Sequence, residues 1–126
     1  MACQSILIVE DDPDIRDSLR MVLELEGYEV RVASNGREGL EVLSTMRRPS
    51  LILLDLTMPV MNGWQFLCAQ RLDDVIAAIP VVVVSAAVDA RAAAQCDAFM
   101  RKPVHVEALL RTVRRHCHVT AVPAQT

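Results

Sequence analysis

The 126-residue sequence lacks a long uninterrupted hydrophobic run, a signal-peptide pattern and an excess of positive charge. Its longest nearly uncharged apolar stretch, 75–88, contains Pro80 and Ser85 and is too short to span a bilayer. No basic region precedes the first apolar run, which argues against a secretory signal. The net charge of −3 argues against a nucleic-acid surface, since such a surface needs a basic stripe. We therefore expect a soluble, cytoplasmic protein with no direct contact to a membrane or to nucleic acid.

Cysteine and lysine are also scarce. The four cysteines have no paired spacing, so reduced thiols are expected rather than disulfides. His116 and His118 flank Cys117, but neighbouring side chains on a helix point in different directions, which disfavours a metal site there. Lysine occurs once, at Lys102, against twelve arginines. That residue either stands where a compact ammonium is needed or is the product of chance.

The residues that are present suit one folded domain. Hydrophobic residues make up 52% of the chain and charged residues 23%, and the length allows a sizeable core. Continuous apolar runs alternate with segments of helical periodicity, without an internal repeat or a linker. We assign residues 1–118 to this domain. Residues 119–126 show no pattern and are predicted to form a disordered tail.

Five apolar runs are predicted as strands and the segments between them as helices. The strands are expected at 5–9, 28–33, 50–55, 79–86 and 97–100. Helices are expected from Asp12–Pro13 to Gly27, after Asn35, after Asn62, over a short stretch at 89–95, and through a last segment with Val106, Leu110, Val113 and Cys117 on its inner face. This alternation predicts a five-stranded parallel sheet covered on both faces, in a doubly wound, three-layer α/β/α sandwich.

Polar side chains follow the strands at the edge where such a sheet binds ligands. Asp12 is accounted for as a helix cap, whereas Asp11 and Asp55 at the ends of buried runs are costly unless something uses them. Crowded carboxylates suit Mg²⁺, which takes oxygen ligands. An aspartate beside Mg²⁺, a hydroxyl and an ammonium can attack phosphorus. The residues gathered at this edge are Glu10, Asp11, Asp55, Ser85 and Lys102.

Four segments, in this order and at these spacings, resemble the receiver domain of two-component response regulators of the chemotaxis-regulator type. They read "ILIVEDDPDIRDSL" at 6–19, "LILLDLTMPVMNGW" at 51–64, "VVVVSA" at 81–86 and "FMRKPV" at 99–104. The resemblance covers about residues 4–117 and implies a flavodoxin-like receiver fold. It also implies a protein that is not an enzyme, since it would catalyse only its own phosphorylation and dephosphorylation.

The resemblance implies that Asp55 is the phosphoacceptor. Its donor would be a phosphohistidine on a sensor histidine kinase or a histidine phosphotransfer protein, and the downstream target would be a protein that the sequence does not name. The family's metal ligands correspond here to four residues. Asp11 and Asp55 would bind Mg²⁺ directly, Thr57 through its backbone carbonyl, and Glu10 through water.

The resemblance also assigns the switch residues. Ser85 and Lys102 would contact phosphoryl oxygens, and Phe99 would be the aromatic whose rotamer follows the hydroxyl. The segment between Ser85 and Lys102 is shorter than in the family and carries "AAQCDA" before the last strand, which predicts a shortened fourth helix. Ala87 occupies a position that tunes phosphoryl lifetime in the family. Because Ala87 cannot orient water, we expect slow self-dephosphorylation.

Three other functions compete with this interpretation. A hydrolase of the haloacid dehalogenase kind normally carries its nucleophile in an Asp-x-Asp pattern after the first strand, and "DLT" lacks the second acid. A flavodoxin-like cofactor binder needs a hydroxyl- and glycine-rich first loop, and "EDDPD" would repel phosphate. A degenerate receiver that acts as a phosphorylation-independent interaction module remains open, although the full set of site residues argues against it.

Overall fold

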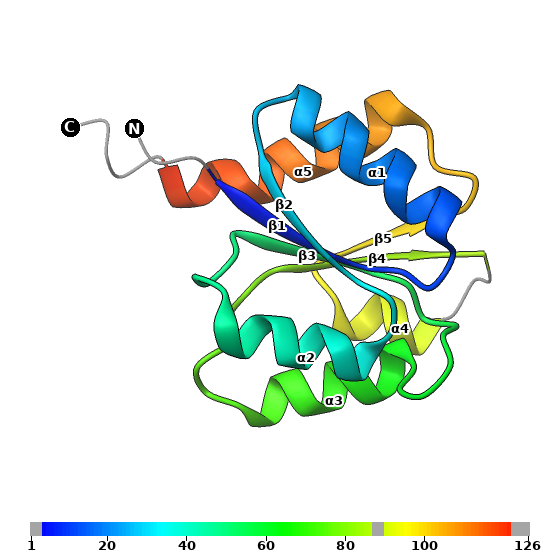
Figure 1. Ribbon diagram of the computed structural model, residues 1–126, viewed down its shortest axis with the longest axis vertical. Coiled ribbons are helices and arrows are strands. Elements are labelled where there is room, and N and C mark those ends of the chain that lie inside the picture. Colours follow the sequence, from blue (N-terminus) through cyan, green and yellow to red (C-terminus); the bar gives the residue numbers. More distant parts are fainter. Residues whose placement is uncertain (1–3, 87–89, 122–126) are drawn as a thin grey trace.

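The described part of the chain, residues 4–86 and 90–121 of a computed structural model, folds into a parallel sheet between two layers of helices (Figure 1). The strands are β1 (Ser5–Val9), β2 (Glu29–Ala33), β3 (Leu51–Leu54), β4 (Val81–Ser85) and β5 (Ala98–Arg101). The helices are α1 (Pro13–Leu25), α2 (Gly36–Thr45), α3 (Gly63–Leu72), α4 (Ala90–Gln95) and α5 (Val106–Ala121). The strand order is β2-β1-β3-β4-β5, which confirms the predicted doubly wound sandwich.

Burial on both faces explains why the central strands are continuously apolar. Every residue of β3 and β4 is buried, because α1 and α5 cover one face of the sheet while α2, α3 and α4 cover the other (Figure 1). Alternate side chains therefore enter two separate cores. Leu7 and Leu54 join the core under α2 and α3, and Ile8 and Leu53 join the core under α1 and α5. The polar residues that follow these strands are thereby fixed at one edge.

The residues predicted at the starts and ends of helices are found there. The Asp12 carboxylate accepts the N–H groups of Asp14 and Ile15 at the start of α1. Asn35 caps α2, and Asn62 forms a reciprocal capping box with Gln65 at the start of α3. Gly27 follows α1 with a φ of 94°, a backbone conformation that favours glycine.

Helix α5 differs from its predicted inner face. Val113 and Cys117 are buried and Leu110 packs against the same core, as expected, but Leu109 is the buried residue of the first turns and Val106 is 50% exposed. The helix extends to Ala121, inside the segment 119–126 that was assigned to a tail, and residues 122–126 lie outside the described residues. With 16 residues α5 is the longest helix, and no helix in the described ranges is long and apolar enough to cross a bilayer.

Helix α4 is short, as predicted, and contacts from arginine tie it to α3. It spans six residues, and the start predicted at Asp89 lies outside the described residues. The Arg91 guanidinium lies 5.1 Å from the centroid of the Trp64 ring, a cation–π geometry. Arg71 donates to the carbonyl of Gln95 at the carboxyl end of α4, where the helix dipole favours a cation. These two contacts attach α4 to α3.

A buried amide shapes the turn between α3 and β4. The Gln70 side chain is fully buried, and its Nε2 donates to the carbonyls of Ile76 at 2.8 Å and Ile79 at 3.1 Å. Its Oε1 has no hydrogen-bond partner among the described residues. The Gln70 side chain therefore supplies the donor for two carbonyls of the turn. In exchange, its own Oε1 is a buried acceptor without a donor in the described part of the chain.

We expect the Gln70→Met substitution to lower the free energy of unfolding by about 2 kcal/mol, because two buried carbonyls lose their donor while the side-chain volume is kept. The matched control is Gln65→Met on the exposed side of the same helix, which removes a cap contact and costs under about 1 kcal/mol. Urea unfolding measures both. Equal losses in the two variants would contradict the role assigned to Gln70.

Candidate functional site

The hydrogen bonding of the parallel sheet continues for one residue beyond the ends of β1, β3 and β5. The N–H of Glu10, after β1, donates to the carbonyl of Ala33 at 3.0 Å, and the N–H of Asp55, after β3, donates to the carbonyl of Val9 at 3.0 Å. The N–H of Lys102, after β5, donates to the carbonyl of Ser85 at 2.8 Å. The residues predicted to form the site are thus held by the same ladder that holds the core, at the carboxyl edge of the sheet.

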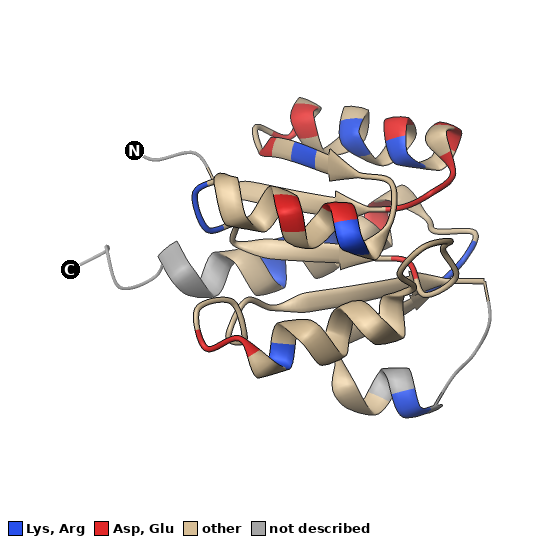
Figure 2. Ribbon diagram, turned by 60° about the horizontal axis from the view of Figure 1, so that its bottom comes forward, with Lys and Arg blue, Asp and Glu red and all other residues tan. Residues whose placement is uncertain are grey.

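Three carboxylates meet at this edge. Glu10, Asp11 and Asp55 each offer one oxygen, and these oxygens lie within 4.8 Å of one another. Glu10 and Asp55 are 2% and 6% exposed, whereas Asp11 is exposed. Figure 2 shows the acidic residues in red along the segment that leads from the sheet into α1. A cluster of carboxylate oxygens that is partly buried and open on one side fits a hard divalent cation such as Mg²⁺.

Lys102 lies between the two buried carboxylates and is closer to one of them. Its Nζ is 2.8 Å from Oε1 of Glu10 and 3.7 Å from Oδ1 of Asp55. The second oxygen of Glu10 accepts the N–H of Asp12 at 3.2 Å. Both oxygens of Glu10 are therefore engaged, which leaves Asp11 and Asp55 as the carboxylates more available to a cation.

Arg16 contributes to the site and was not predicted from the sequence. Its Nη1 donates to the backbone carbonyl of Glu10 at 3.1 Å, across the first turn of α1. The side chain is half-buried, and its charge also lowers the pKa of Glu38, although hydrogen bonds from Ser34 are the larger causes of that shift. No sequence pattern indicated this contact, because it forms only when the first turn of α1 folds back over the carboxyl end of β1.

The loop after β3 packs directly against the backbone of Asp55. A Cβ atom added at Gly63 would lie 2.5 Å from the carbonyl oxygen of Asp55 and 2.7 Å from Cα of Leu56, so only glycine fits. Val60 has a φ of 67°, a left-handed conformation that is strained for a β-branched residue. Thr57 is exposed, and its backbone N–H donates to the Asp55 carboxylate. The loop thus holds Asp55 tightly in place.

The pKa of the Asp55 carboxyl is raised from 3.8 to about 6. Burial is the largest cause, because it penalises the charged form, and the neighbouring Glu10 carboxylate adds to it. Lys102 and the Thr57 N–H act in the opposite direction, and Asp11 raises the pKa further. The net shift shows that repulsion and burial outweigh the single ammonium, so a negative charge on Asp55 costs stability until a cation reaches it.

Two of the remaining predicted residues, Ser85 and Phe99, lie in the neighbouring strands β4 and β5. Ser85 is buried at the end of β4, and the Lys102 N–H bonds to its carbonyl. Phe99 lies in β5 opposite Val83, half-buried against the core under α2 and α3. The structure therefore places Phe99 on the same side of the sheet as α4. Ala87 lies outside the described residues, so the prediction about phosphoryl lifetime remains a prediction.

We expect the metal-free protein to lose stability as the pH rises from about 4 to about 6, relative to an Asp55→Asn variant. A carboxyl with a raised pKa binds its proton more tightly in the folded state, so stability falls when the proton leaves. The shift corresponds to roughly 2 to 3 kcal/mol. Urea unfolding in EDTA at several pH values measures the difference between the two proteins. A difference that does not change with pH would contradict the raised pKa.

Comparison with known proteins supports the geometry. The family model for the response regulator receiver domain matches residues 6–114. A 14.6 kDa protein of Leptolyngbya boryana, named only for its place next to sodA1, is 35% identical, and the match covers 93% of this chain and 92% of that protein. The DNA-binding master transcriptional regulator RpaA of Synechocystis is 36% identical over 86% of this chain, and the chain spans only 47% of RpaA.

Solved structures agree with the sequence relatives. The signal receiver domain of a histidine kinase from Syntrophus aciditrophicus aligns with a TM-score of 0.83 at 32% identity, covering 92% of this chain and 91% of that one. The chemotaxis protein CheY4 of Vibrio cholerae aligns with a TM-score of 0.84 at 29% identity, covering 91% and 99%. With its strand order, its acidic cluster and a family match over residues 6–114, the chain belongs to the response regulator receiver domains of two-component signalling, which are not conventional enzymes.

Proposed function

We propose that Asp55 accepts a phosphoryl group from a phosphohistidine on a sensor histidine kinase or a phosphotransfer protein, with Mg²⁺, and that the modified protein changes its partner binding. The observation that carries the proposal is the setting of Asp55. It is a buried carboxylate beside two further carboxylates and 3.7 Å from an ammonium. No stabilising role accounts for such an arrangement, since the charge of Asp55 costs stability.

The proposed step transfers a phosphoryl group between two nucleophiles. An Oδ atom of Asp55 forms a bond to phosphorus while the bond from phosphorus to the histidine nitrogen breaks. The electron pair of the broken bond returns to the imidazole, and the product is an acyl phosphate. Asp55 must be ionised to attack, and a pKa of about 6 leaves it mostly ionised at neutral pH.

Mg²⁺ would be held by Asp11, Asp55 and the carbonyl of Thr57, with Glu10 acting through water. When bound, the cation neutralises charge on the carboxylates and on the incoming phosphoryl oxygens. Glu10 suits an indirect role, because one of its oxygens is engaged by Lys102 and the other by the N–H of Asp12. These ligand assignments rest on the chemistry of the oxygen donors and on the family resemblance.

The other two groups act on the phosphoryl oxygens in this proposal. Lys102 moves its ammonium from Glu10 toward the phosphoryl group, since a more highly charged partner then lies within reach. Ser85 donates its hydroxyl to another phosphoryl oxygen. Phe99 follows this movement in β5 and transmits it through packing alone, because it has no hydroxyl. The outcome is a shift between two states at the β4–β5 edge of the sheet.

Intact mass after incubation with acetyl phosphate and Mg²⁺ tests the proposal. We expect the parent protein to gain one phosphoryl group, while Asp55→Asn and a parent sample in EDTA gain none. Asp74→Asn, an exposed aspartate after α3, is the matched control and should gain one group. If a folded parent binds Mg²⁺ but gains no mass, the chain is a binding-only receiver and the proposal fails.

Arg16 offers a second test, directed at the cation. We expect Arg16→Gln to weaken Mg²⁺ binding by about tenfold, because the carbonyl of Glu10 loses the donor that fixes the acidic pair. Arg20→Gln is the control. Arg20 lies one turn further along α1, where it pairs with Asp17 at 3.9 Å, and its loss should leave Mg²⁺ affinity unchanged. Calorimetric titration measures both, and equal affinities in the two variants would count against a positioning role for Arg16.

A further inference from the structure

Strand β2 forms an edge of the sheet with free hydrogen-bonding groups. Within the described residues β2 pairs with β1 alone. The Glu29 N–H donates to the carbonyl of Gln4, and the carbonyl of Ala33 accepts the N–H of Glu10. Because alternate residues of a parallel strand bond to the same neighbour, residues 29, 31 and 33 face β1. Val30 and Val32 therefore turn their N–H and carbonyl groups outward, in position to bond to a further strand.

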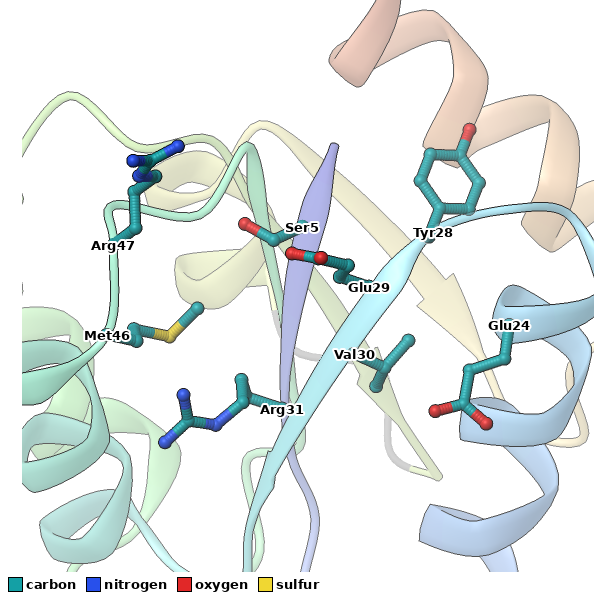
Figure 3. A pocket seen from close by; sticks show the side chains of 8 residues that line it. All are labelled: Ser5, Glu24, Tyr28, Glu29, Val30, Arg31, Met46 and Arg47. Atoms are coloured by element: carbon teal, nitrogen blue, oxygen red, sulfur yellow. The ribbon is translucent and has the colours of Figure 1, made fainter. Parts of the chain in front are cut away.

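A hollow of about 650 Å³ runs along this edge (Figure 3). Glu24 of α1 borders it on one side of β2, while Met46 and Arg47 at the end of α2 border it on the other. Figure 1 shows α1 on one side of β2 and α2 on the other. The outward groups of β2 are therefore not covered by the chain's own helices, and there is room beside them for a second strand.

The side chains of β2 carry a pattern of alternating charge on one face. Glu29 and Arg31 are both exposed and lie on the side of Met46, as Figure 3 shows. Neither forms an ion pair with another described residue. Val30 points to the opposite side, toward α1, and packs with Val32 at the margin of the core. The edge thus presents one acid and one base two residues apart, with apolar side chains behind them.

We propose that β2 pairs antiparallel with β2 of a second copy of this chain, in the register that places Val30 opposite Val30. Three two-fold registers use the outward groups, with Val30 opposite Val30, Val30 opposite Val32, or Val32 opposite Val32. The first places Glu29 opposite Arg31 twice. The second places Arg31 opposite Arg31, which is repulsive, and the third places Arg31 opposite Ala33. Charge complementarity therefore selects the first register.

The face of the two paired β2 strands that points toward α1 is compatible with the same register. It brings the two Val30 side chains together and sets Tyr28 opposite Val32, both of which already pack at the edge of the core under α1 and α5. A two-fold axis closes this interface, so pairing stops at a dimer whose sheet is continuous through both copies. The contact uses a five-residue strand, so a weak dimer is expected. It lies at the edge opposite β5 and does not depend on phosphorylation of Asp55.

Sedimentation equilibrium at low ionic strength, over a micromolar to millimolar concentration series, tests the proposal. We expect the mass of the parent to rise from 13.9 kDa toward twice that value. Glu29→Arg sets arginine opposite arginine at both pairs, and Arg31→Glu sets glutamate opposite glutamate. Each should weaken the association at least tenfold. The double variant Glu29→Arg/Arg31→Glu exchanges the two charges and should restore the parent's association.

The control is Glu41→Arg on the exposed face of α2, which changes the net charge as Glu29→Arg does and should leave the dimer unchanged. Thermal unfolding by circular dichroism confirms that each variant is folded. A parent that stays monomeric throughout the series overturns the proposal and leaves this edge to an extended segment of another protein. A dimer that survives both single reversals, or one that the double exchange does not restore, also overturns it.

Discussion

Repulsion among the carboxylates of Glu10, Asp11 and Asp55 is the constraint on which the rest of the site depends. The backbone of Glu10 and that of Asp55 are held by the sheet's own hydrogen bonds, so neither residue can withdraw without disturbing β1 or β3. Gly63 closes the loop against the carbonyl of Asp55 and removes a second route of relaxation. The fully buried strands supply the stability that lets this strain persist at one edge.

Lys102 relieves part of the repulsion, and the way it does so matters for the proposed function. Its ammonium sits nearer to Glu10 than to Asp55, and the pKa of the Asp55 carboxyl stays raised because burial and the Glu10 charge outweigh the lysine. A bound cation or phosphoryl group would change which negatively charged group attracts the Lys102 ammonium most strongly. The Lys102 N–H bonds to the carbonyl of Ser85, so a movement of this residue would also act on the junction of β4 and β5. Lys102 thus both carries the positive charge beside the carboxylates and takes part in the hydrogen bonding between β4 and β5.

Local patterns predicted most of the fold and the meeting of Glu10, Asp11 and Asp55 at one edge of the sheet, while contacts between distant segments were not predictable. The caps at Asp12, Asn35 and Asn62 depend on residues within one turn, and these predictions are confirmed. The inner face of α5 was predicted correctly at Val113 and Cys117 but not at its start, where Val106 is half exposed and Leu109 is buried, because helical periodicity alone does not say where the sheet lies. The Arg16 contact and the preference of Lys102 for Glu10 arise only when separate segments meet, so spacing gave no access to them.

The cation–π contact between Arg91 and Trp64 has a spectroscopic consequence. Trp64 is the only tryptophan of the chain, so all indole fluorescence comes from one position. That position lies one residue after Gly63, which packs on the backbone of Asp55, and under a guanidinium from α4. Emission from this indole depends on the charge above its ring and on its exposure to water. The protein thus carries an intrinsic optical reporter between the loop after β3 and α4, and no added label is needed to follow α4.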